Sequence, residues 1–574
     1  MNKKIESIMI SSKYTIRETM KIITGAASRG APTGIALVVN NNKKLLGIVT
    51  DGDIRRALVN DVDIDSAVEN IMINDPITVP KDLSETKMIE LVTKKVETSG
   101  RIRDVKVDQV IIVDKDGRVD DVLNFFELWK GSDVKNKTVC VIGLGFVGLT
   151  LSIVLADAGF KVIGYDINKE VVNHINTGRP HFYEKGLPSL LKFHVARGNL
   201  RADSDLTEGK ADIYILSVST PIGKNRKPNL DLLRKATRKV GKVLKKRDTV
   251  ILRSTVPVGT TRNLVLPILE EASGLKADED FYLSFAPERT VEGNALEELR
   301  SIPQVMGGLN KRSLDESVNF FSYFNNTVVR VPSLEAAEMV KLINNSFRDL
   351  SFGFANELAL ICDRWGLDAV NIVKAANEGY PRNPIPVPSP GVGGVCLKKD
   401  PYLYAHSAEK VEHKAEISLM SRKINEYMPM FIVRKVESFM KRYKNNANDV
   451  KVFIIGFAFK GEPETSDTRG STAIDLVNLI KDKTTWRLTG YDPVVGKEVI
   501  ESNGVVGASL REGFKGADCV LIMNNHRSYL DMDILGLTNL MSKPALLFDC
   551  WHLFPCAEIE RVEGIVYEGL SGKN

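Results

Sequence analysis

Hydrophobic and polar positions change their period several times along the chain, and each change predicts a different kind of element. Short apolar runs alternate with stretches of helical period over residues 137–331 and again after residue 450, which predicts parallel strands with crossover helices. Between these segments the period is helical, and Ser333 is placed to cap a helix from Leu334 to about Trp365. The pattern therefore predicts two α/β units joined by a helical part.

A weak internal repeat covers the first 130 residues. The segment Ser7–Ile10 recurs as Asn70–Ile73, each time followed by a polar turn and a threonine. Each copy then contains an amphipathic stretch and two apolar runs separated by a turn, so two copies of one small α+β unit are predicted. The expected helices cover residues 16–23 and 85–96, and the expected strands cover residues 36–39, 45–50, 110–113 and 119–123.

Length and charge limit the possible classes of protein. At 574 residues the chain is too long for one hydrophobic core. Seventy-eight basic and 73 acidic side chains leave a formal charge of +5 without a long basic run, which does not favour nucleic acid as a partner but leaves small anionic ligands open. We expect four domains, at residues 1–130, 136–331, 332–442 and 450–574, with the polar stretch Tyr443–Asp449 as a linker.

The cysteines and the apolar segments indicate a reducing compartment. Six scattered cysteines without a C-x-x-C pair argue against a disulfide framework and a zinc cluster, so no metal is expected. The first residues lead into no apolar signal segment. The uncharged run Val139–Ala156 is interrupted by glycines and followed by a second β-rich run, so we expect no membrane span. The expected location is the cytoplasm.

Three glycines at the start of that run predict a dinucleotide site. Gly143 and Gly145 permit a tight turn and the approach of the backbone to a pyrophosphate, while Gly148 permits close packing of the following helix. Asp166 ends the next strand, where a carboxylate accepts ribose hydroxyls and repels a 2′-phosphate. This pattern indicates NAD rather than NADP, with a flavin or a structural turn as the remaining alternatives. The predicted fold class is α/β, with two Rossmann-like doubly wound domains joined by a helical middle domain and preceded by the α+β pair.

Cys396 stands in a glycine-rich segment, residues 389–400, four positions before Asp400. A free thiol is only about 3% ionised at pH 7, and lowering its pKa by roughly 1.5 units would make it half ionised. We expect Lys398, Lys399 and exposed backbone N–H groups to lower the pKa of this thiol. On the segment alone, a structural turn with a buried cysteine is an equal alternative.

Several further motifs, in a fixed order, extend this picture over residues 136–560. After the glycine fingerprint come Ser217–Pro221, Ser254–Gly259, Ala286–Gly293, Glu338–Asn345, the Cys396 segment, Gly456–Lys460 and Asp467–Arg469. With these motifs the chain closely resembles the UDP-glucose/GDP-mannose dehydrogenase family. The resemblance implies oxidation of the primary alcohol C6 of a nucleotide-linked sugar to a carboxylate with two NAD+.

This resemblance also assigns catalytic roles by residue. It implies that Cys396 adds to an aldehyde intermediate, because the resulting thiohemiacetal has a second hydride to lose and becomes a thioester. Lys341 and Asn345 lie four apart on a predicted helix, where they can stabilise an oxyanion; a solvated helix face is the alternative, weakened by their apolar neighbours. Asp400 matches a carboxylate that orients water or transfers a proton.

Two glutamates and a threonine complete the implied catalytic set. Glu288 and Glu292 match family acids, and Thr255 matches a hydroxyl near the water that attacks the thioester. Glu292 could instead touch the cofactor, and in isolation both glutamates would be ordinary surface charges. Which of Lys341, Asp400 or the glutamates moves the first proton stays open.

Binding residues follow from the same resemblance. The implied cofactor residues are Gly143, Gly145, Phe146, Val147, Gly148, Asp166, Thr220 and Ser254, and the implied substrate residues are Lys460, Arg469, Arg382, Phe459 and Lys399. The segment from Lys460 to Arg469 is about two residues longer than the family pattern, so the contact of Arg469 is less certain than that of Lys460. Arg382 resembles an arginine that reaches the substrate of a neighbouring subunit, which implies a homodimer or a higher homo-oligomer.

The sugar is less well determined by these motifs. The segments around Pro390 and Asp400 resemble enzymes of UDP-N-acetylhexosamines, although Val395 stands where those enzymes commonly have histidine. We favour UDP-N-acetylmannosamine or UDP-N-acetylglucosamine, followed by UDP-glucose and then GDP-mannose.

The N-terminal repeat resembles a tandem cystathionine-β-synthase (CBS) domain pair, a module that often binds adenine nucleotides. Thr50 and Asp53 match the positions that hold the phosphate and ribose of such a ligand, whereas the second copy has Leu123 and Phe126 there. A structural or dimerising pair is the alternative. A catalytically idle nucleotide-sensing regulator is the rival function, although it should have lost some of the catalytic residues.

Overall fold

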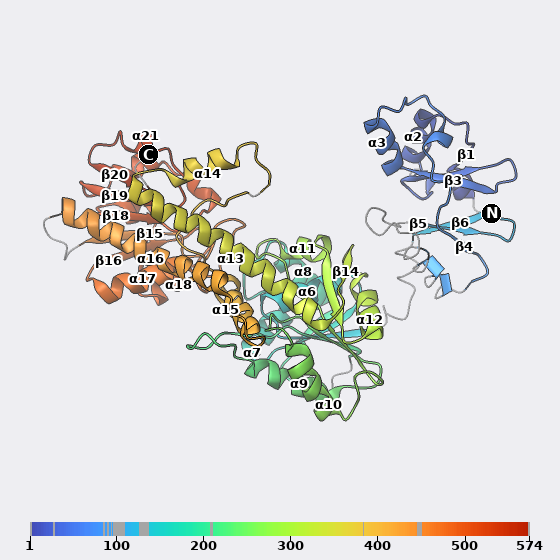
Figure 1. Ribbon diagram of the computed structural model, residues 1–574, viewed down its shortest axis with the longest axis horizontal. Helices are drawn as coiled ribbons and strands as arrows, with labels where there is room; N and C mark the ends of the chain where they lie inside the picture. The colour runs from blue at the N-terminus through green and yellow to red at the C-terminus, as the bar shows by residue number, and fades with distance from the viewer. Residues whose placement is uncertain are drawn as a thin grey trace. The chain divides into compact units, whose positions relative to one another are not determined.

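The computed structural model describes residues 3–26, 29–83, 87–88, 91–92, 95, 109–124, 137–206, 211–382, 384–444 and 450–571. The chain folds as two compact units, residues 1–136 and 137–574 (Figure 1). Within the described ranges, none of the helices combines the length and the apolar character needed to cross a bilayer.

The first unit contains the two predicted copies of one small motif. Its helices are α1 (Lys3–Glu6), α2 (Ile16–Thr24), α3 (Asp51–Val59) and the 3-10 turn η2 (Val68–Asn70), and its strands are β1 (Met9–Ile10), β2 (Ile35–Val39), β3 (Leu45–Thr50), β4 (Thr78–Pro80), β5 (Gln109–Val113) and β6 (Val119–Asn124). In each three-stranded sheet the first strand is parallel to the second, and the second is antiparallel to the third. A register shift follows Val38 in one sheet and Ile112 in the other, at equivalent positions. The helix expected over residues 85–96 falls mostly outside the described residues, as does Phe126.

An eight-stranded sheet begins the second unit. The strands are β7 (Thr138–Ile142), β8 (Lys161–Tyr165), β9 (Leu200–Asp203), β10 (Ile213–Leu216), β11 (Thr249–Leu252), β12 (Tyr282–Phe285), β13 (Gln304–Gly308) and β14 (Val328–Arg330). Their order is β14-β13-β12-β11-β10-β7-β8-β9, and only the β12–β13 pair is antiparallel. Because chain direction across the sheet reverses between β7 and β10, a crevice is expected at their carboxyl ends.

The segments between these strands form helices and one π-helical turn, which cover the sheet. They are α6 (Phe146–Asp157), α7 (Lys169–Asn176), α8 (Leu187–Ala196), α9 (Asp231–Val243), a π-helical turn η4 (Thr261–Val265), α10 (Leu266–Ser273), α11 (Ala295–Ser301) and α12 (Lys311–Phe321). The uncharged run that starts at Val139 is thus β7, a turn and α6, which confirms that it is not a membrane helix.

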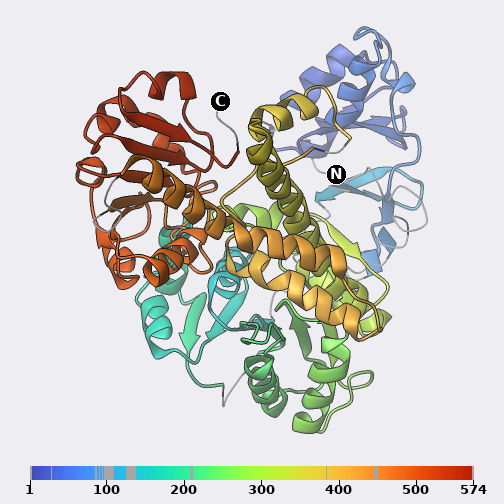
Figure 2. The same cartoon turned by 60° about the vertical axis from the view of Figure 1, so that its left-hand side comes forward.

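Four helices form the middle of the second unit: α13 (Leu334–Trp365), α14 (Ala369–Asn377), α15 (Val395–Glu409) and α16 (Glu416–Tyr443). Ser333 caps α13 by accepting the Ala336 N–H, as predicted, and Gly366 ends the helix in the left-handed conformation. At 32 residues, α13 is about 48 Å long. It packs along α15 and α16 (Figure 2).

The chain ends in a six-stranded, fully parallel sheet. Its strands are β15 (Lys451–Ile455), β16 (Arg487–Tyr491), β17 (Val506–Gly507), β18 (Cys519–Ile522), β19 (Ala545–Asp549) and β20 (Ile565–Glu568), in the order β17-β16-β15-β18-β19-β20. The helices are α17 (Thr472–Lys483), α18 (Lys497–Ser502), α19 (Leu510–Phe514), η5 (Arg527–Asp531), α20 (Ile534–Thr538) and α21 (Cys556–Ile559). Alternate residues of β15 enter two different cores, and α16 supplies part of one of them. The α/β fold with two doubly wound sheets and a helical middle is therefore confirmed. Residues 445–449 of the expected linker lie outside the described ranges.

Candidate active site

Cys396 lies at the beginning of a helix rather than within a loop. Helix α15 begins at Val395, and Gly394 is its N-cap residue. Cys396 therefore occupies the first turn, where unpaired N–H groups and the helix dipole favour a thiolate. All six cysteines are described, and Cys396 is the one exposed to solvent, since four are buried and Cys556 is half-buried. This position makes Cys396 the accessible thiol of the chain.

The two glycines before this helix lie against Phe459, and the ring of Phe459 leaves no room for a side chain at Gly394. A Cβ atom at Gly394 would lie 2.8 Å from Cδ2 of Phe459, and Gly394 has a φ of +85°. A Cβ atom at Gly393 would lie 3.2 Å from the carbonyl oxygen of Phe459. The Gly394 N–H also donates to the carbonyl oxygen of Gly470 at 3.2 Å. The thiol is thus held against the segment that carries Lys460 and Arg469.

Asp400 lies one turn along α15 from Cys396 and is completely buried. Its Oδ2 accepts a hydrogen bond from Asn345 Nδ2 at 2.5 Å, and its Oδ1 accepts one from Lys399 Nζ at 2.6 Å. Lys341 lies one turn before Asn345 on α13, and its ammonium acts electrostatically on Cys396. Helices α13 and α15 therefore bring the predicted Lys341, Asn345, Cys396 and Asp400 together.

Lys341 differs from the other lysines of this cluster. It is only 7% exposed, and within the described part of the chain no hydrogen-bond or ion-pair partner lies within reach of its Nζ atom. A buried ammonium without a partner is unfavourable unless a ligand or a developing negative charge occupies the space beside it. Its three N–H donors are available to a reacting oxygen.

The expected lowering of the thiol pKa is wrong for this structure. Burial among protein atoms and the charge of Asp400 raise the pKa of Cys396, while Lys341 and Lys399 lower it. Because solvent reaches the side chain, water screens part of this rise. Lys398 does not contribute as predicted, since its ammonium forms an ion pair with Asp475, and Lys399 is paired with Asp400.

Arg422, which the sequence did not reveal, fixes the segment around the thiol. It is fully buried, and Nη1 donates to Asp349 Oδ1 at 2.6 Å and to the carbonyl oxygen of Leu397 at 3.2 Å. That carbonyl lacks its helical donor because residue 401, four positions later, is Pro401. Nη2 donates to the carbonyl oxygen of Val392 at 3.2 Å. Arg422 thus holds the backbone on both sides of Cys396.

Glu292 lies between the eight-stranded sheet and the segment of residues 460–469. Its Oε2 accepts from Thr465 Oγ1 at 3.4 Å, its Oε1 is 3.9 Å from Arg469 Nη2, and its carbonyl oxygen accepts from Lys460 Nζ at 2.6 Å. Burial and the charge of Asp467 raise the pKa of Glu292 to about 7, although Arg469 and Lys460 lower it. A carboxyl group with this pKa can take a proton from water near neutral pH.

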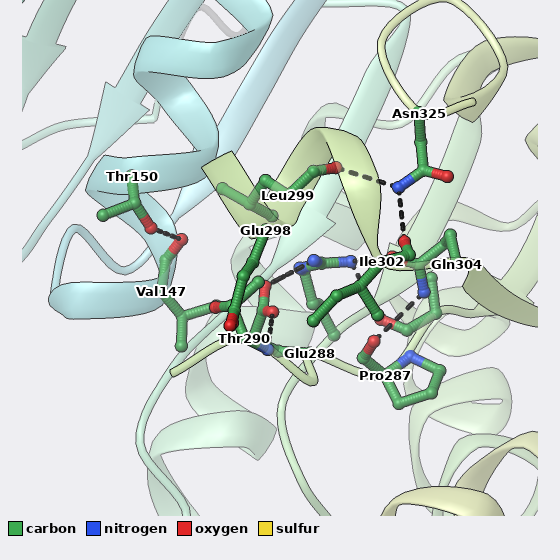
Figure 3. Close-up of polar contacts among 12 residues, drawn as sticks. Val147, Thr150, Pro287, Glu288, Thr290, Glu298, Leu299, Ile302, Gln304 and Asn325 are labelled. Atoms are coloured by element: carbon green, nitrogen blue, oxygen red, sulfur yellow. Dashed lines mark hydrogen bonds and ion pairs between the residues drawn. The ribbon is translucent and has the colours of Figure 1, made fainter. Parts of the chain in front are cut away.

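Glu288 has a different environment and is already paired. Nε of the fully buried Arg253 donates to Glu288 Oε2 at 3.0 Å, and Nη2 of Arg253 pairs with the same oxygen. The Thr290 N–H donates to Glu288 Oε1 at 2.8 Å (Figure 3). Burial raises the pKa of Glu288, but Arg253, Thr290 and Lys341 outweigh it, so the pKa is lowered. Arg253 also donates to Gln304 Oε1 at 3.0 Å. Glu288 is therefore an anchored carboxylate.

The turn after β7 has the shape required for a dinucleotide. A Cβ atom at Gly148 would lie 1.8 Å from the carbonyl oxygen of Gly143, so helix α6 can approach the turn this closely only without a side chain. A Cβ atom at Gly145 would meet nothing within 4 Å, which leaves open space beside the helix N-terminus for a pyrophosphate. Asp166 follows β8, and its Oδ2 accepts the Leu144 N–H at 2.8 Å. The residues present therefore fit NAD.

Other predicted cofactor residues lie around the same crevice edge. Phe146 begins α6 and packs on Phe182 with 4.8 Å between ring centroids, and the carbonyl oxygen of Val147 accepts from Thr150. The Thr220 hydroxyl, after β10, donates to the carbonyl oxygen of Thr255 at 2.5 Å. The hydroxyl of Ser254, which follows β11, donates to the carbonyl oxygen of Val218 at 2.7 Å, so Ser254, Thr255 and Thr220 link the ends of two neighbouring strands.

The second sheet repeats the turn of the first. Gly456, with a φ of +95°, follows β15, and Asp492 follows β16. Asp492 Oδ2 accepts the Phe457 N–H at 2.7 Å, as Asp166 accepts that of Leu144. Sequence reasoning missed Asp492, although its place after a strand was the same signal that identified Asp166. A second nucleotide-sized crevice is therefore expected at this edge.

Of the remaining predicted binding residues, two lie near Glu292 and one lies elsewhere. Desolvation lowers the pKa of Lys460, which lies beside Glu292, and Arg469 pairs with Asp467, with 2.6 Å between Nη2 and Oδ2. Arg382 is exposed and stacks over the ring of Tyr380, so it is not part of the Cys396 cluster within its own chain.

In the first unit, Thr50 and Asp53 form a capping box at the start of α3. The Thr50 hydroxyl donates to Asp53 Oδ2 at 2.6 Å, and the Asp53 N–H donates to Thr50 Oγ1 at 3.3 Å. Arg56 Nη2 donates to Asp53 Oδ1 at 2.5 Å. Both side chains therefore already stabilise the helix N-terminus.

Comparison with protein families accounts for both units. Residues 137–325 match the NAD binding domain of the UDP-glucose/GDP-mannose dehydrogenase family, residues 335–427 match its central domain and residues 453–555 match its UDP binding domain. Residues 1–60 match the CBS domain.

The match to individual relatives extends over nearly the whole length of each relative. A UDP-N-acetyl-D-mannosamine dehydrogenase of Campylobacter jejuni is 33% identical over 404 residues, which are 69% of this chain and 96% of the relative. An NDP-N-acetyl-D-galactosaminuronic acid dehydrogenase of Ralstonia nicotianae is 31% identical over 407 residues, 70% of this chain and 93% of the relative. The solved UDP-D-ManNAc dehydrogenase of Pyrococcus horikoshii is 30% identical with a TM-score of 0.69, covering 75% of this chain and 99% of that chain.

Proposed function

Because the chain belongs to the UDP-glucose/GDP-mannose dehydrogenase family, we propose that it oxidises C6 of a UDP-N-acetylhexosamine to the carboxylate. It is an NAD-dependent nucleotide-sugar dehydrogenase. The observation that carries the proposal is the meeting of Cys396 and Asp400 on α15 with Lys341 and Asn345 on α13.

The thiol explains how one site can remove four electrons. NAD+, held at the turn of Gly143, Gly145 and Gly148, would supply the acceptor for the hydride of the alcohol carbon, and loss of the hydroxyl proton to a base would leave an aldehyde. Cys396 adds to the aldehyde as a thiolate, and protonation gives a thiohemiacetal. Its carbon would give a second hydride to a second NAD+, while its hydroxyl loses its proton to a base. The resulting thioester is hydrolysed by water, which releases the carboxylate and the free thiol.

The cations and amides around the thiol stabilise the charges of these steps. We assign Lys341 to the oxygen that becomes negative, because its buried ammonium has free donors on the Cys396 side. Asn345 and Lys399 hold Asp400, which stays close enough to the thiol to act on its pKa. Asp400 is then suited to orient the group that receives or gives the proton.

We assign thioester hydrolysis to Glu292 and an anchoring role to Glu288. A general base must titrate near the working pH. Glu292, with a pKa of about 7, meets this condition, whereas Glu288 is held ionised by Arg253. We also assign Thr255 to the water that attacks the thioester. The nucleotide part of the substrate is assigned to Lys460, Arg469 and Phe459.

The choice of sugar is supported by the relatives. Those with at least 30% identity include UDP-N-acetyl-D-mannosamine dehydrogenases and NDP-N-acetyl-D-galactosaminuronic acid dehydrogenases. UDP-glucose is the second candidate, since a solved UDP-glucose dehydrogenase of Pyrobaculum islandicum has a TM-score of 0.67 at 26% identity. The test is a panel of UDP-N-acetylmannosamine, UDP-N-acetylglucosamine, UDP-glucose and GDP-mannose with NADH counted per sugar. Preferred turnover of UDP-glucose would refute the assignment.

We also propose a homodimer built on α13. One face of this helix is apolar and exposed at spacings of four and seven residues, at Ile343, Phe347, Phe354, Ile361 and Trp365. An apolar stripe with this period fits a second copy of the same helix. In such a dimer the exposed Arg382 would serve the partner's substrate, as the family resemblance implies.

The first unit supports a regulatory role. We propose that an adenine nucleotide binds at Thr50 and Asp53, for which the match to the CBS domain is the support. The ligand would have to replace the hydrogen bonds of the capping box. Unchanged turnover and melting temperature with millimolar AMP, ADP and ATP would refute this proposal. We retain residues 1–130, 136–331, 332–442 and 450–574 as the proposed domains, and the cytoplasm as the proposed location, which the scattered cysteines without a C-x-x-C pair support.

A further inference from the structure

Glu184 is a buried carboxylate for which the proposed reaction provides no use. It follows α7 and precedes α8, and only 2% of it is exposed. Its Oε2 accepts the Gly293 N–H at 2.7 Å, and its Oε1 accepts the Ala295 N–H at 2.8 Å. The residue before Gly293 is Glu292, the proposed base.

The backbone beside Glu292 is held from the opposite direction as well. Gly293 has a φ of +96°, and a Cβ atom there would lie 2.7 Å from the carbonyl oxygen of Glu464. Lys460 Nζ donates to the carbonyl oxygen of Glu292 at 2.6 Å. The chain at Glu292 is therefore enclosed between Glu184 on one side and residues 460–464 on the other.

Tyr183 extends this attachment to the C-terminal segment. Its hydroxyl donates to Glu464 Oε1, and Glu464 Oε2 is 3.3 Å from His526 Nε2. Two consecutive residues thus contact the segments on either side of Glu292: Glu184 binds Gly293 and Ala295, and Tyr183 binds Glu464. These contacts fix the orientation of the loop that carries Glu292.

We propose that Glu184 is a positioning residue that holds the Glu292 carboxylate at the thioester formed on Cys396. The proposal rests on the proposed function, because it assumes that Glu292 activates the hydrolytic water. Glu184 does not touch the reacting atoms in this account. It acts through the two N–H groups that flank the turn after Glu292.

A purely structural role, as a cap of the helix that follows, is the alternative that the double variant tests. The helix that follows, α11, has only seven residues, and its N-cap residue Asn294 makes no capping hydrogen bond with its side chain. A short polar side chain is the usual cap, and it avoids the desolvation of a buried charge. Burial raises the pKa of Glu184, while the Gly293 and Ala295 N–H groups and Lys460 lower it.

The test compares Glu184→Gln, Glu292→Gln and the double variant with wild type, using the UDP-sugar on which wild type forms NADH. Glutamine keeps one acceptor oxygen and places an NH2 group against the second N–H donor. In Glu184→Gln we expect the first burst of NADH to keep its size, hydrolysis to slow by about tenfold or more, and intact mass to show an acyl adduct on Cys396. Asp212→Asn is the control, since Asp212 accepts the Thr138 N–H at 2.8 Å. This contact lies where β7 and β10 begin, at the opposite end of these strands from the crevice.

The double variant separates positioning from general stability. If Glu184 acts through Glu292, the double variant is no slower in hydrolysis than Glu292→Gln alone, because the two losses are not additive. Additive losses, or a Glu184→Gln enzyme that hydrolyses at the wild-type rate, would overturn the proposal. Failure of the proposed function gives another result, in which wild type forms no NADH with any UDP-sugar or Glu292→Gln accumulates no adduct.

Discussion

Replacing Gly394 with alanine tests whether the backbone before Cys396 determines the position of the thiol. Gly394 has a φ of +85° and a ψ of 146°. A Cβ atom added there would lie 2.8 Å from Cδ2 of Phe459. Gly366 is a matched control, because its φ is +69° but a Cβ atom there would meet nothing within 4 Å. Both changes strain the backbone, and only one displaces a neighbour.

The two variants should differ in stability and in rate. Gly366→Ala costs about 1 to 2 kcal/mol for the left-handed conformation. Gly394→Ala costs about 1 to 3 kcal/mol for a backbone region that only glycine populates freely, and about 1 to 3 kcal/mol more for overlap with the ring. A displacement of the thiol by about 1 Å lowers kcat on the order of 100-fold.

The assays are thermal melting and steady-state NADH formation with saturating NAD+. Gly394→Ala should melt at a lower temperature than Gly366→Ala and lose about 100-fold in kcat, whereas Gly366→Ala should stay within about threefold of wild type. Equal melting temperatures together with wild-type kcat in Gly394→Ala would refute the reasoning, because the Phe459 contact would then not position the thiol.

Three more predictions follow from the site and the long helix. Asp400→Asn should lower kcat about 100-fold yet speed alkylation of Cys396 by iodoacetamide at pH 7, because Asp400 raises the pKa of that thiol; slower alkylation would contradict the assigned charge effect. Hydrolysis of the thioester should fall about tenfold per pH unit below about 7, since Glu292 acts only when deprotonated, and Glu292→Gln should remove this dependence, as stopped-flow measurements across pH would show. Phe354→Glu should convert the dimer to a monomer by light scattering, and a monomeric wild type would refute the proposed interface.

Local signals explain what the sequence predicted correctly. The glycines and Asp166 are close in sequence, so strand, turn and acid could be recognised together. Ser333 and the apolar period after it predicted the whole of α13, because capping and amphipathicity are properties of adjacent residues. The position of Lys341 one turn before Asn345 followed from a spacing of four on a helix.

Long-range contacts explain what it missed. Glu184 accepts N–H groups more than 100 positions away, and Arg253 reaches Glu288 across 35 positions, so neither contact has a local signature. The expected effect of Lys398 on Cys396 was wrong because Asp475, in a different domain of the second unit, pairs with that lysine. The helical position of Cys396 was missed because glycines suggested a turn, while they actually make room for Phe459.

The most direct test of the central claim measures how many NADH form per sugar and whether the oxidised sugar is released as the acid. Wild type should form two NADH for each UDP-sugar consumed and release the acid. Cys396→Ser, which keeps an oxygen nucleophile of much lower reactivity, should release no acid at a measurable rate, because the aldehyde is not captured as a thiohemiacetal. One NADH per sugar with a free aldehyde from wild type, or acid release by Cys396→Ser at the wild-type rate, would contradict the account.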